Sequence, residues 1–285
     1  MKLGIGVPNH IAGVAGTVVV EWARRAERRG FDALTTIDRL IYPSLDSITT
    51  LALAAGATST VDLVTNVLLA PLYPPVVLAK QLATLADASG GRLTLGVGVG
   101  ARPDDYRWAG VEFDSRGRTL DEAVVIWRRV WAGEPLYGDT ALCPAPVSIP
   151  VLFGGKGAPT LRRVATVGDG WAGGAVRDYE TQASFTEQIR ARWLDAGRAD
   201  RPLLQTSVNV ALGDASVVEE GRRNLAAYYG NKPDYAALNV ADMVSSPRDA
   251  LDTVRAYRDL GFDRLLFHPA VASADQVDRL ADAVL

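Results

Sequence analysis

The stretch from Leu63 to Gly100, LVTNVLLAPLYPPVVLAKQLATLADASGGRLTLGVGVG, contains a complete strand–helix–strand unit and decides the fold class. An apolar run rich in β-branched residues stands at each end of it, which favours two strands. Between them, Pro75–Ala88 has helical spacing, begins on prolines and stops at Ser89-Gly90-Gly91. These are typical signals for the start and the end of a helix.

The same pattern repeats on both sides of this unit. Strand-like runs begin at Leu3, Ala33, Leu63 and Leu93, a constant spacing of 30 residues. Such a repeat requires parallel strands, because the helix must return the chain across the sheet before the next strand begins. Four further strand candidates bring the number to eight: Val151–Phe153, Gly170–Ala172, Leu204–Leu212 and Arg264–His268. We therefore predict an α/β fold, a (β/α)8 TIM barrel that forms one domain over residues 1–285.

The composition fits an ordinary globular protein, with 48% hydrophobic and 22% charged residues. A net charge of -3 and a pI of about 5.5 provide no basic field for nucleic acid or an anionic membrane, so we expect neither partner. The single cysteine, Cys143, excludes an intramolecular disulfide, and no apolar run is long enough to span a bilayer. Met1 leads into a strand without a signal-type segment, so we expect a cytoplasmic protein.

Helices and connections complete the barrel pattern. Val18–Arg29 has one apolar face, as expected of an outer helix, and ends before a glycine. The sequence Thr119-Leu120-Asp121-Glu122 fits a capping box at a helix start, so we assign Glu122 a structural role. Long loops at the carboxyl ends of strands usually build the site of a barrel. Three long connections are therefore candidates for the site: Ala101–Arg118, Gly133–Pro150 and Leu238–Pro247.

The only two histidines fall at strand ends. His10 follows the first strand and His268 ends the eighth, so closure of the barrel would bring them to the same mouth. Because imidazole titrates near neutral pH, such a pair can donate protons to, or polarise, a substrate beside a redox ring. Hydrogen-bonded loop histidines without a catalytic role would give the same pattern, and both interpretations stay open.

The glycine-rich loop Gly154-Gly155-Lys156-Gly157 follows the fifth strand and precedes a helix over Pro159–Val167. Glycines allow backbone N–H groups to approach an anion, the helix N-terminus adds positive potential, and Lys156 can neutralise charge. We predict a phosphate site here, although it is not a Walker A loop. A plain turn with a surface lysine is the alternative.

Two other strand ends carry candidate cofactor-binding residues. Gly98 and Gly100 close the fourth strand, where the missing side chains either admit a flat ring or serve barrel packing. Asp38 and Arg39 close the second strand, and two roles are open for them. They can form a salt bridge at the rim, or Asp38 can accept from a ring N–H while Arg39 stabilises an anionic reduced ring. Trp171 can contact a ring, but burial in the core is the more ordinary role of a large aromatic residue.

At this point a family resemblance covers most of the chain. The sequence resembles the bacterial luciferase-like monooxygenase superfamily in several blocks that together are specific: Trp22–Asp32, Leu78–Lys80, Leu85–Leu93, Gly96–Gly100, Pro150–Gly155, Gly168–Trp171 and Gly261–Asp263. The resemblance implies a TIM-like barrel, reduced FMN or the deazaflavin F420 at the carboxyl ends of the strands, and often a homodimer. It also implies that the cofactor phosphate lies at Gly154–Gly157.

The same resemblance singles out two further positions. Many members have a non-prolyl cis peptide at the end of the third strand, and Asn66-Val67 resembles that position, so we count both residues as cofactor-binding. Many members, especially those that use F420, also have a histidine after the aspartate that Asp38 resembles, and here that residue is Arg39. His10 or His268 is the candidate replacement.

We therefore favour a monooxygenase that receives reduced FMN from a separate reductase and oxygenates a small organic substrate with O2, because no NAD(P)H fingerprint is present. The alternative is an F420-dependent oxidoreductase that transfers a hydride at C5, and a non-catalytic flavin-binding protein is a third possibility. A metal-dependent hydrolase is disfavoured because no cluster of metal ligands appears. A Schiff-base lyase is disfavoured because it needs a desolvated lysine on a strand, and we predict helix, loop or terminus positions for the lysines Lys2, Lys80, Lys156 and Lys232. The sequence does not identify the substrate.

Overall fold

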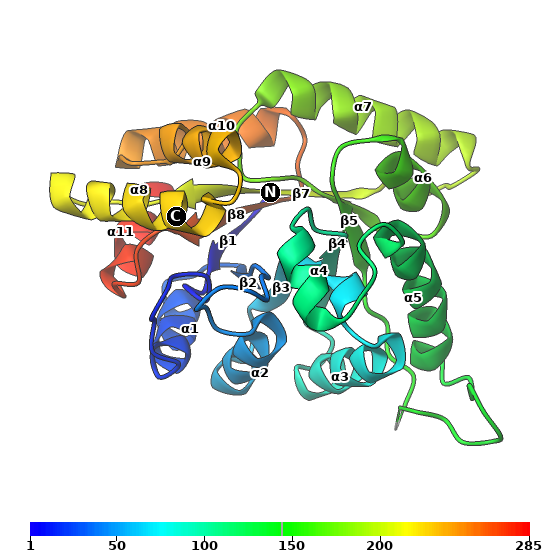
Figure 1. Cartoon of the computed structure of the whole chain (residues 1–285). Helices are drawn as coiled ribbons and strands as arrows, with labels where there is room; N and C mark the ends of the chain where they lie inside the picture. Colours follow the sequence, from blue (N-terminus) through cyan, green and yellow to red (C-terminus); the bar gives the residue numbers. More distant parts are fainter. Residues whose placement is uncertain (144) are drawn as a thin grey trace.

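The computed structural model describes residues 1–143 and 145–285 and contains a closed parallel barrel (Figure 1). Each strand pairs in parallel with its neighbours in sequence, and β8 pairs with β1 to close the barrel. The strands are β1 (Lys2–Gly6), β2 (Ala33–Thr36), β3 (Asp62–Leu69), β4 (Leu93–Gly98), β5 (Val151–Gly154), β6 (Gly170–Ala172), β7 (Leu203–Val210) and β8 (Arg264–Pro269). The predicted TIM-barrel fold is confirmed, and the strand spacing in the sequence was the correct signal.

Helices α1, α2, α3, α5, α6 and α7 follow one another in chain order around the strands in Figure 1, α8, α9 and α10 lie together between α7 and α11, and α4 lies in front of the strands. The helices are α1 (Val18–Arg28), α2 (Ser47–Ala57), η1 (Ala70–Leu72), α3 (Pro75–Ala88), α4 (Pro103–Ala109), α5 (Arg116–Trp131), α6 (Ala158–Thr166), α7 (Tyr179–Asp195), α8 (Ala215–Tyr229), α9 (Pro233–Ala241), α10 (Pro247–Asp259) and α11 (Asp275–Val284). None of the helices described combines the length and the apolar character that crossing a membrane requires.

The first helix illustrates how the sequence directs packing. Val19, Trp22, Ala23 and Ala26 of α1 are buried against the barrel, whereas its polar face stays outside. The chain then reverses at Gly30, whose φ of +88° favours glycine. Burial of such apolar stripes around the ring gives one continuous core between helices and strands.

Two local predictions were wrong. Helix α5 begins at Arg116, so Thr119 and Glu122 lie inside it; Glu122 is an exposed residue near Arg118 and belongs to no capping box. The connection Gly133–Pro150 leaves the end of α5 and enters β5, and a barrel places such helix-to-strand connections at the amino ends of its strands. The described residues of this connection, 133–143 and 145–150, therefore lie away from the mouth. The other two long connections contain helix α4 and the end of helix α9.

Candidate functional site

A cavity of about 430 Å³ lies among the carboxyl ends of the strands and the segments that follow them. Glycines and alanines form much of its wall, so backbone is exposed to whatever enters. Its lining residues are Ile37, Asn66, Val67, Gly154, Gly155, Lys156, Ala172, Gly173, Gly174, Ala175, Val176, Ser207, Tyr229, Tyr235 and His268. Six of these were predicted as site residues from the sequence: Asn66, Val67, Gly154, Gly155, Lys156 and His268. The structure thus brings these six to one place.

The loop at the start of α6 offers several features that suit an anion. Gly155 has φ +100°, and a Cβ there would lie 3.0 Å from Thr160 Oγ1, so glycine is the residue that fits. Helix α6 has no side-chain cap, which leaves N–H groups of its first turn available. The Lys156 side chain is exposed and lines both this cavity and an adjoining one.

The adjoining cavity, of about 360 Å³, adds positive charge beside the same loop. Arg116 and Arg163 line it together with Gly154–Gly157, and Asp114 contributes one carboxylate. Arg163 forms an ion pair with Asp121 at 2.6 Å, whereas Arg116 packs over the Phe113 ring and has no ion pair in the described part of the chain. The glycine-rich motif does not mark either arginine in the sequence, because Arg116 belongs to helix α5 and Arg163 to helix α6.

Trp171 supports the loop from behind. Its Nε1 donates to the carbonyl of Gly155 at 2.8 Å, while its fully buried ring packs on Phe185 and Phe262. Direct contact with a cofactor ring, one of the two roles considered for Trp171, is therefore not what this structure shows. The side chain lies outside the cavity and fixes the backbone that lines it.

His10 and His268 lie together, with ring centroids 6.0 Å apart and nearly perpendicular planes. Closure of β8 on β1 brings them together, as predicted. Both are almost fully buried, and none of their ring nitrogens has a hydrogen bond of normal geometry to a described residue. His268 lines the cavity, and the His10 ring packs against the His268 ring and against Tyr228.

Burial makes these histidines unusually weak bases. It lowers the pKa of His10 to about 4, against a smaller opposing effect of the Pro269 backbone. Burial, with repulsion from His10, lowers the pKa of His268 to about 3. Both imidazoles are therefore neutral at neutral pH, so each can offer one N–H donor and one nitrogen acceptor but no positive charge.

The Asp38 carboxylate accepts hydrogen bonds from residues at and after the end of β3 and does not face the cavity. Its Oδ2 accepts from the Leu69 amide at 2.9 Å and from the Tyr73 hydroxyl at 3.1 Å. Burial raises the pKa of its carboxyl to about 6 despite these two donors. In the structure described, Asp38 does not line the cavity. It joins the end of β2 to the segment after β3.

Arg39 also differs from the prediction. No ion pair joins it to Asp38 within residues 1–143 and 145–285; its guanidinium donates to the Tyr228 carbonyl and packs over the Tyr42 ring, 4.5 Å from the centroid. The rim salt bridge considered for Asp38 and Arg39 is therefore wrong. Arg39 stands outside the first cavity, and stabilisation of an anionic ring by it stays a prediction.

The glycines of β4 make room for a neighbouring strand. A Cβ on Gly98 would lie 2.8 Å from Val67 Cγ2, and one on Gly100 would lie 3.1 Å from Leu69 Cδ2. The Asn66–Val67 peptide is cis, as the family resemblance implied, and the register between β3 and β4 shifts there. Barrel packing thus accounts for Gly98 and Gly100, and their contact with a cofactor stays a prediction.

Polar side chains from β7 reach into the barrel beneath the cavity. Asn66 donates to Ser207 Oγ at 3.0 Å and accepts from Gln205 Nε2 at 2.9 Å. Asn209, two residues further, donates to Asn239 of α9 at 2.9 Å. The sequence reading missed these residues, although Gln205, Ser207 and Asn209 alternate along one strand, which is the signal for side chains on one face.

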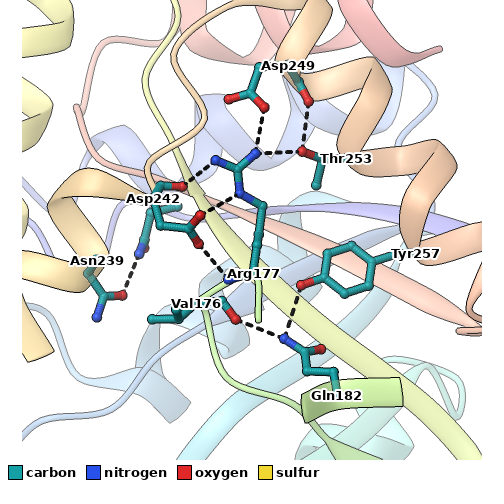
Figure 2. A network of polar contacts seen from close by, with 9 residues as sticks. Val176, Arg177, Gln182, Asn239, Asp242, Asp249, Thr253 and Tyr257 are labelled. Carbon is teal, nitrogen blue, oxygen red and sulfur yellow. Dashed lines mark hydrogen bonds and ion pairs between the residues drawn. The ribbon is translucent and has the colours of Figure 1, made fainter. Parts of the chain in front are cut away.

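Arg177 anchors the segment Ala172–Val176, which forms one wall of the cavity. Figure 2 shows its side chain between Asp242 and Asp249, with distances of 2.9 Å and 2.6 Å to their carboxylates. The Val176 carbonyl accepts from Gln182, which also donates to the Tyr257 hydroxyl. Ion pairs therefore hold the wall between β6 and α7 to the end of α9 and to α10, which are more than 60 residues later in the sequence.

Comparison with known proteins adds independent information. The family model for luciferase-like monooxygenases matches residues 1–243. An uncharacterised protein of Mycobacterium tuberculosis is 31% identical over 189 residues, a match that spans 55% of this chain and only 65% of that relative. The F420-dependent glucose-6-phosphate dehydrogenase of Beutenbergia cavernae is 28% identical, covering 91% of this chain and 90% of that protein.

Solved structures give the same fold with different cofactors. The monooxygenase RslO1 from Streptomyces bottropensis has a TM-score of 0.81 at 22% identity and covers 99% of this chain and 96% of its own. An F420-dependent secondary alcohol dehydrogenase has a TM-score of 0.82 at 18% identity and covers 100% and 98%. The oxygenating component of 3,6-diketocamphane monooxygenase from Pseudomonas putida, in complex with FMN, has a TM-score of 0.73 at 17% identity. It covers 99% of this chain and 96% of its own. At these identities the likeness establishes the fold alone.

Proposed function

Since the chain belongs to the luciferase-like monooxygenase family, we propose that it is an oxidoreductase that oxygenates a small organic substrate with reduced FMN and O2. The observation that carries this proposal is the glycine-lined cavity of about 430 Å³ that ends at the loop Gly154–Gly157. A planar ring with a phosphate tail needs both features. Walls of glycine and alanine let the ring lie against backbone, and an anion site beside them receives the phosphate.

The residues present fit such a cofactor. Gly155 and the first turn of α6 would receive the phosphate, with Lys156 supplying a positive charge. Val67 and Asn66 would contact the ring from below. The unpaired ring nitrogens of His268 provide a further polar group on the cavity wall. A polar side chain this deeply buried without a partner is unusual, which supports a role for His268 toward a bound ligand.

Reduced flavin supplies the electrons with which O2 is activated, and the protein's part is placement and exclusion of water. His268 is neutral, so it would hold a hydrogen bond to the ring or substrate without adding charge. The wall Ala172–Val176, held by Arg177, would keep that geometry fixed. A separate reductase would supply the reduced flavin, and we expect the enzyme to act as a homodimer.

A second candidate is F420-dependent hydride transfer. The relative that covers 91% of this chain is an F420-dependent dehydrogenase, and this observation favours the deazaflavin. Both cofactors carry a phosphate and a planar ring, so the same cavity would accept either. Many F420-dependent members of the family have a histidine at the position of Arg39. The arginine at this position therefore argues against F420.

Titration with three ligands separates the candidates. Oxidised FMN, and reduced FMN and reduced F420 under nitrogen, are added separately, and fluorescence gives each Kd. Air is then admitted to the reduced samples and reoxidation is followed by absorbance. We expect reduced FMN to bind most tightly and to reoxidise with turnover of substrate. Tight binding of F420 with slow reoxidation would establish the second candidate instead, and binding without any oxidation of substrates would indicate a flavin carrier.

A further inference from the structure

Apart from the cavity of about 360 Å³ beside the loop Gly154–Gly157, a cavity of about 410 Å³ adjoins the first one. We call it the second cavity. It is lined by Ala101, Arg102, Tyr229, Asn231, Lys232 and Tyr235. Tyr229 and Tyr235 line both cavities, so the two spaces share an aromatic wall. The segments after β4 and after β7 supply all of its lining. Ala101 and Arg102 belong to the connection Ala101–Arg118 that was a candidate for the site, whereas the other four residues precede the candidate connection Leu238–Pro247.

Two cations in this cavity lack carboxylate partners. Neither Arg102 nor Lys232 has an ion pair with any described residue, although many other arginines of the chain do. Arg102 is held in place: its Nε donates to Asn231 Oδ1 at 3.2 Å and its guanidinium lies 5.3 Å from the Tyr228 ring centroid. A fixed arginine whose other N–H groups remain free is suited to bind an oxyanion.

A third cation, Arg39, lies near this cavity. Arg39 lies close enough that the charge of Arg102 contributes to lowering its pKa, after the larger effect of burial. Asp104 and Asp105 on α4 are the carboxylates that act on Arg39, and Asp105 already accepts from the Ile41 amide at 2.7 Å. Neither carboxylate forms an ion pair with Arg102 in the described structure, so its charge is left available for a ligand.

The shared wall is aromatic and well supported. Tyr229 packs edge-to-face against Tyr228 and against Tyr235, with ring centroids 4.9 Å and 5.2 Å apart. The Tyr235 carbonyl accepts from Asn239, which in turn is bonded to Asn209 of β7. Helix α9 is therefore anchored to the barrel, and the wall offers firm ring surfaces for a flat apolar ligand.

We propose that the second cavity is a substrate subsite for a small aromatic acid, with its carboxylate or phosphate bound by Arg102 and Lys232 and its ring against Tyr229 and Tyr235. This inference rests on the proposed function, because it assumes that the first cavity holds the redox cofactor. The cofactor phosphate has its own site at Gly154–Gly157, lined by different cations. The substrate would then reach from the second cavity past the tyrosines toward the cofactor.

Binding of matched anionic and neutral probes tests the subsite. Benzoate, phenyl phosphate and benzamide are titrated by calorimetry into the full chain saturated with oxidised FMN, and also into the chain alone. We expect at least one of the two anions to bind the wild type about tenfold more tightly than benzamide, since charge-assisted hydrogen bonds are the stronger ones. If neither anion is preferred over benzamide, the proposal is overturned.

Variants assign the preference to residues. Arg102→Gln should weaken binding of the preferred anion about tenfold and Lys232→Gln severalfold, without a change for benzamide. Arg107→Gln is the matched control, because Arg107 is an exposed cation on α4 that lines neither cavity. Anion binding that survives in Arg102→Gln, or that falls equally in Arg107→Gln, would contradict the assignment.

Cofactor titration of the same variants keeps the two proposals apart. The affinities for reduced FMN and F420 should be unchanged in Arg102→Gln; a selective loss of either would make the second cavity part of the cofactor site and would overturn the substrate subsite. If the wild type binds neither cofactor but still prefers the anion in an Arg102-dependent way, the proposed function fails while the anion site stands.

Discussion

The loop Gly154–Gly157 and His268, whose ring packs on His10, border the same cavity, yet these two parts of the wall are built in opposite ways. The loop is a local feature of one strand–helix junction, partly exposed and bordered by cations. His10 and His268 come from opposite ends of the chain, are buried, and are neutral because burial lowers both pKa values. One side of the cavity is thus electropositive and the other is polar but uncharged.

This difference indicates a division of tasks. Charge at an accessible loop gives affinity for an anionic group, and exposure keeps the cost of holding that charge low. A neutral polar group in a buried wall can orient a ligand without attracting water or counterions. Four changes, in order of decreasing effect, would break or sharpen this contrast.

The largest effect is expected from Gly155→Asp. The change adds a side chain at φ +100° and places a negative charge where the phosphate is expected to lie. Affinity for reduced FMN, measured by fluorescence titration, should fall at least about a hundredfold. Gly197→Asp is the control, since Gly197 also has a positive φ but lies between α7 and β7, at the other end of the barrel. Equal affinity in Gly155→Asp and the wild type would remove the anion site.

The second effect concerns stability against pH. The folded-state pKa of each histidine is below its ordinary value, so the unfolded chain takes up protons first, and stability is lost as pH falls below about 6.5. Between about pH 7 and about pH 5 the loss amounts to about 2 kcal/mol per histidine. His268→Asn should therefore reduce the fall in unfolding free energy over this range by about 2 kcal/mol, as measured by urea denaturation at each pH.

Asp38 provides a comparison of opposite sign. Its folded-state pKa is raised to about 6, so the folded chain takes up the proton first and stability is gained as pH falls through that value. Asp38→Asn removes this gain and should steepen the same loss by about 1 kcal/mol. A pH profile that changes in the same direction in both variants would show that burial does not set these pKa values.

The smallest effect is expected from Trp171→Phe. This variant removes the donor that holds the Gly155 carbonyl but keeps an aromatic ring in the core. Affinity for reduced FMN should fall about threefold to fivefold, the contribution of one hydrogen bond. Trp193→Phe is matched to it, because Trp193 Nε1 donates to the Asp200 carbonyl at the same 2.8 Å away from the cavity. A similar loss of affinity in both would mean that the effect is general destabilisation.

Much of the barrel and part of the site could be predicted from the sequence. The constant spacing placed the first four strands, short apolar runs placed the other four, and a strand-end rule placed His268 and Lys156 at the mouth. The capping box at Glu122 was wrong because the helix starts one turn earlier, at Arg116. Arg116 and Tyr235 were missed, since their approach to the cavities depends on where helices pack and no local motif marks them. Ser207 was missed although it alternates with Gln205 and Asn209 along one strand.

The sequence by itself determined the alternation of strands and helices, because hydrophobic periodicity and the glycine and proline signals act within a few residues of the chain. It also determined the family. Only the tertiary structure decided that Trp171 supports the loop from outside, that Arg39 does not pair with Asp38, and that both histidines lose their charge. Burial and partner choice come from residues distant in sequence, and they set the chemistry of each group.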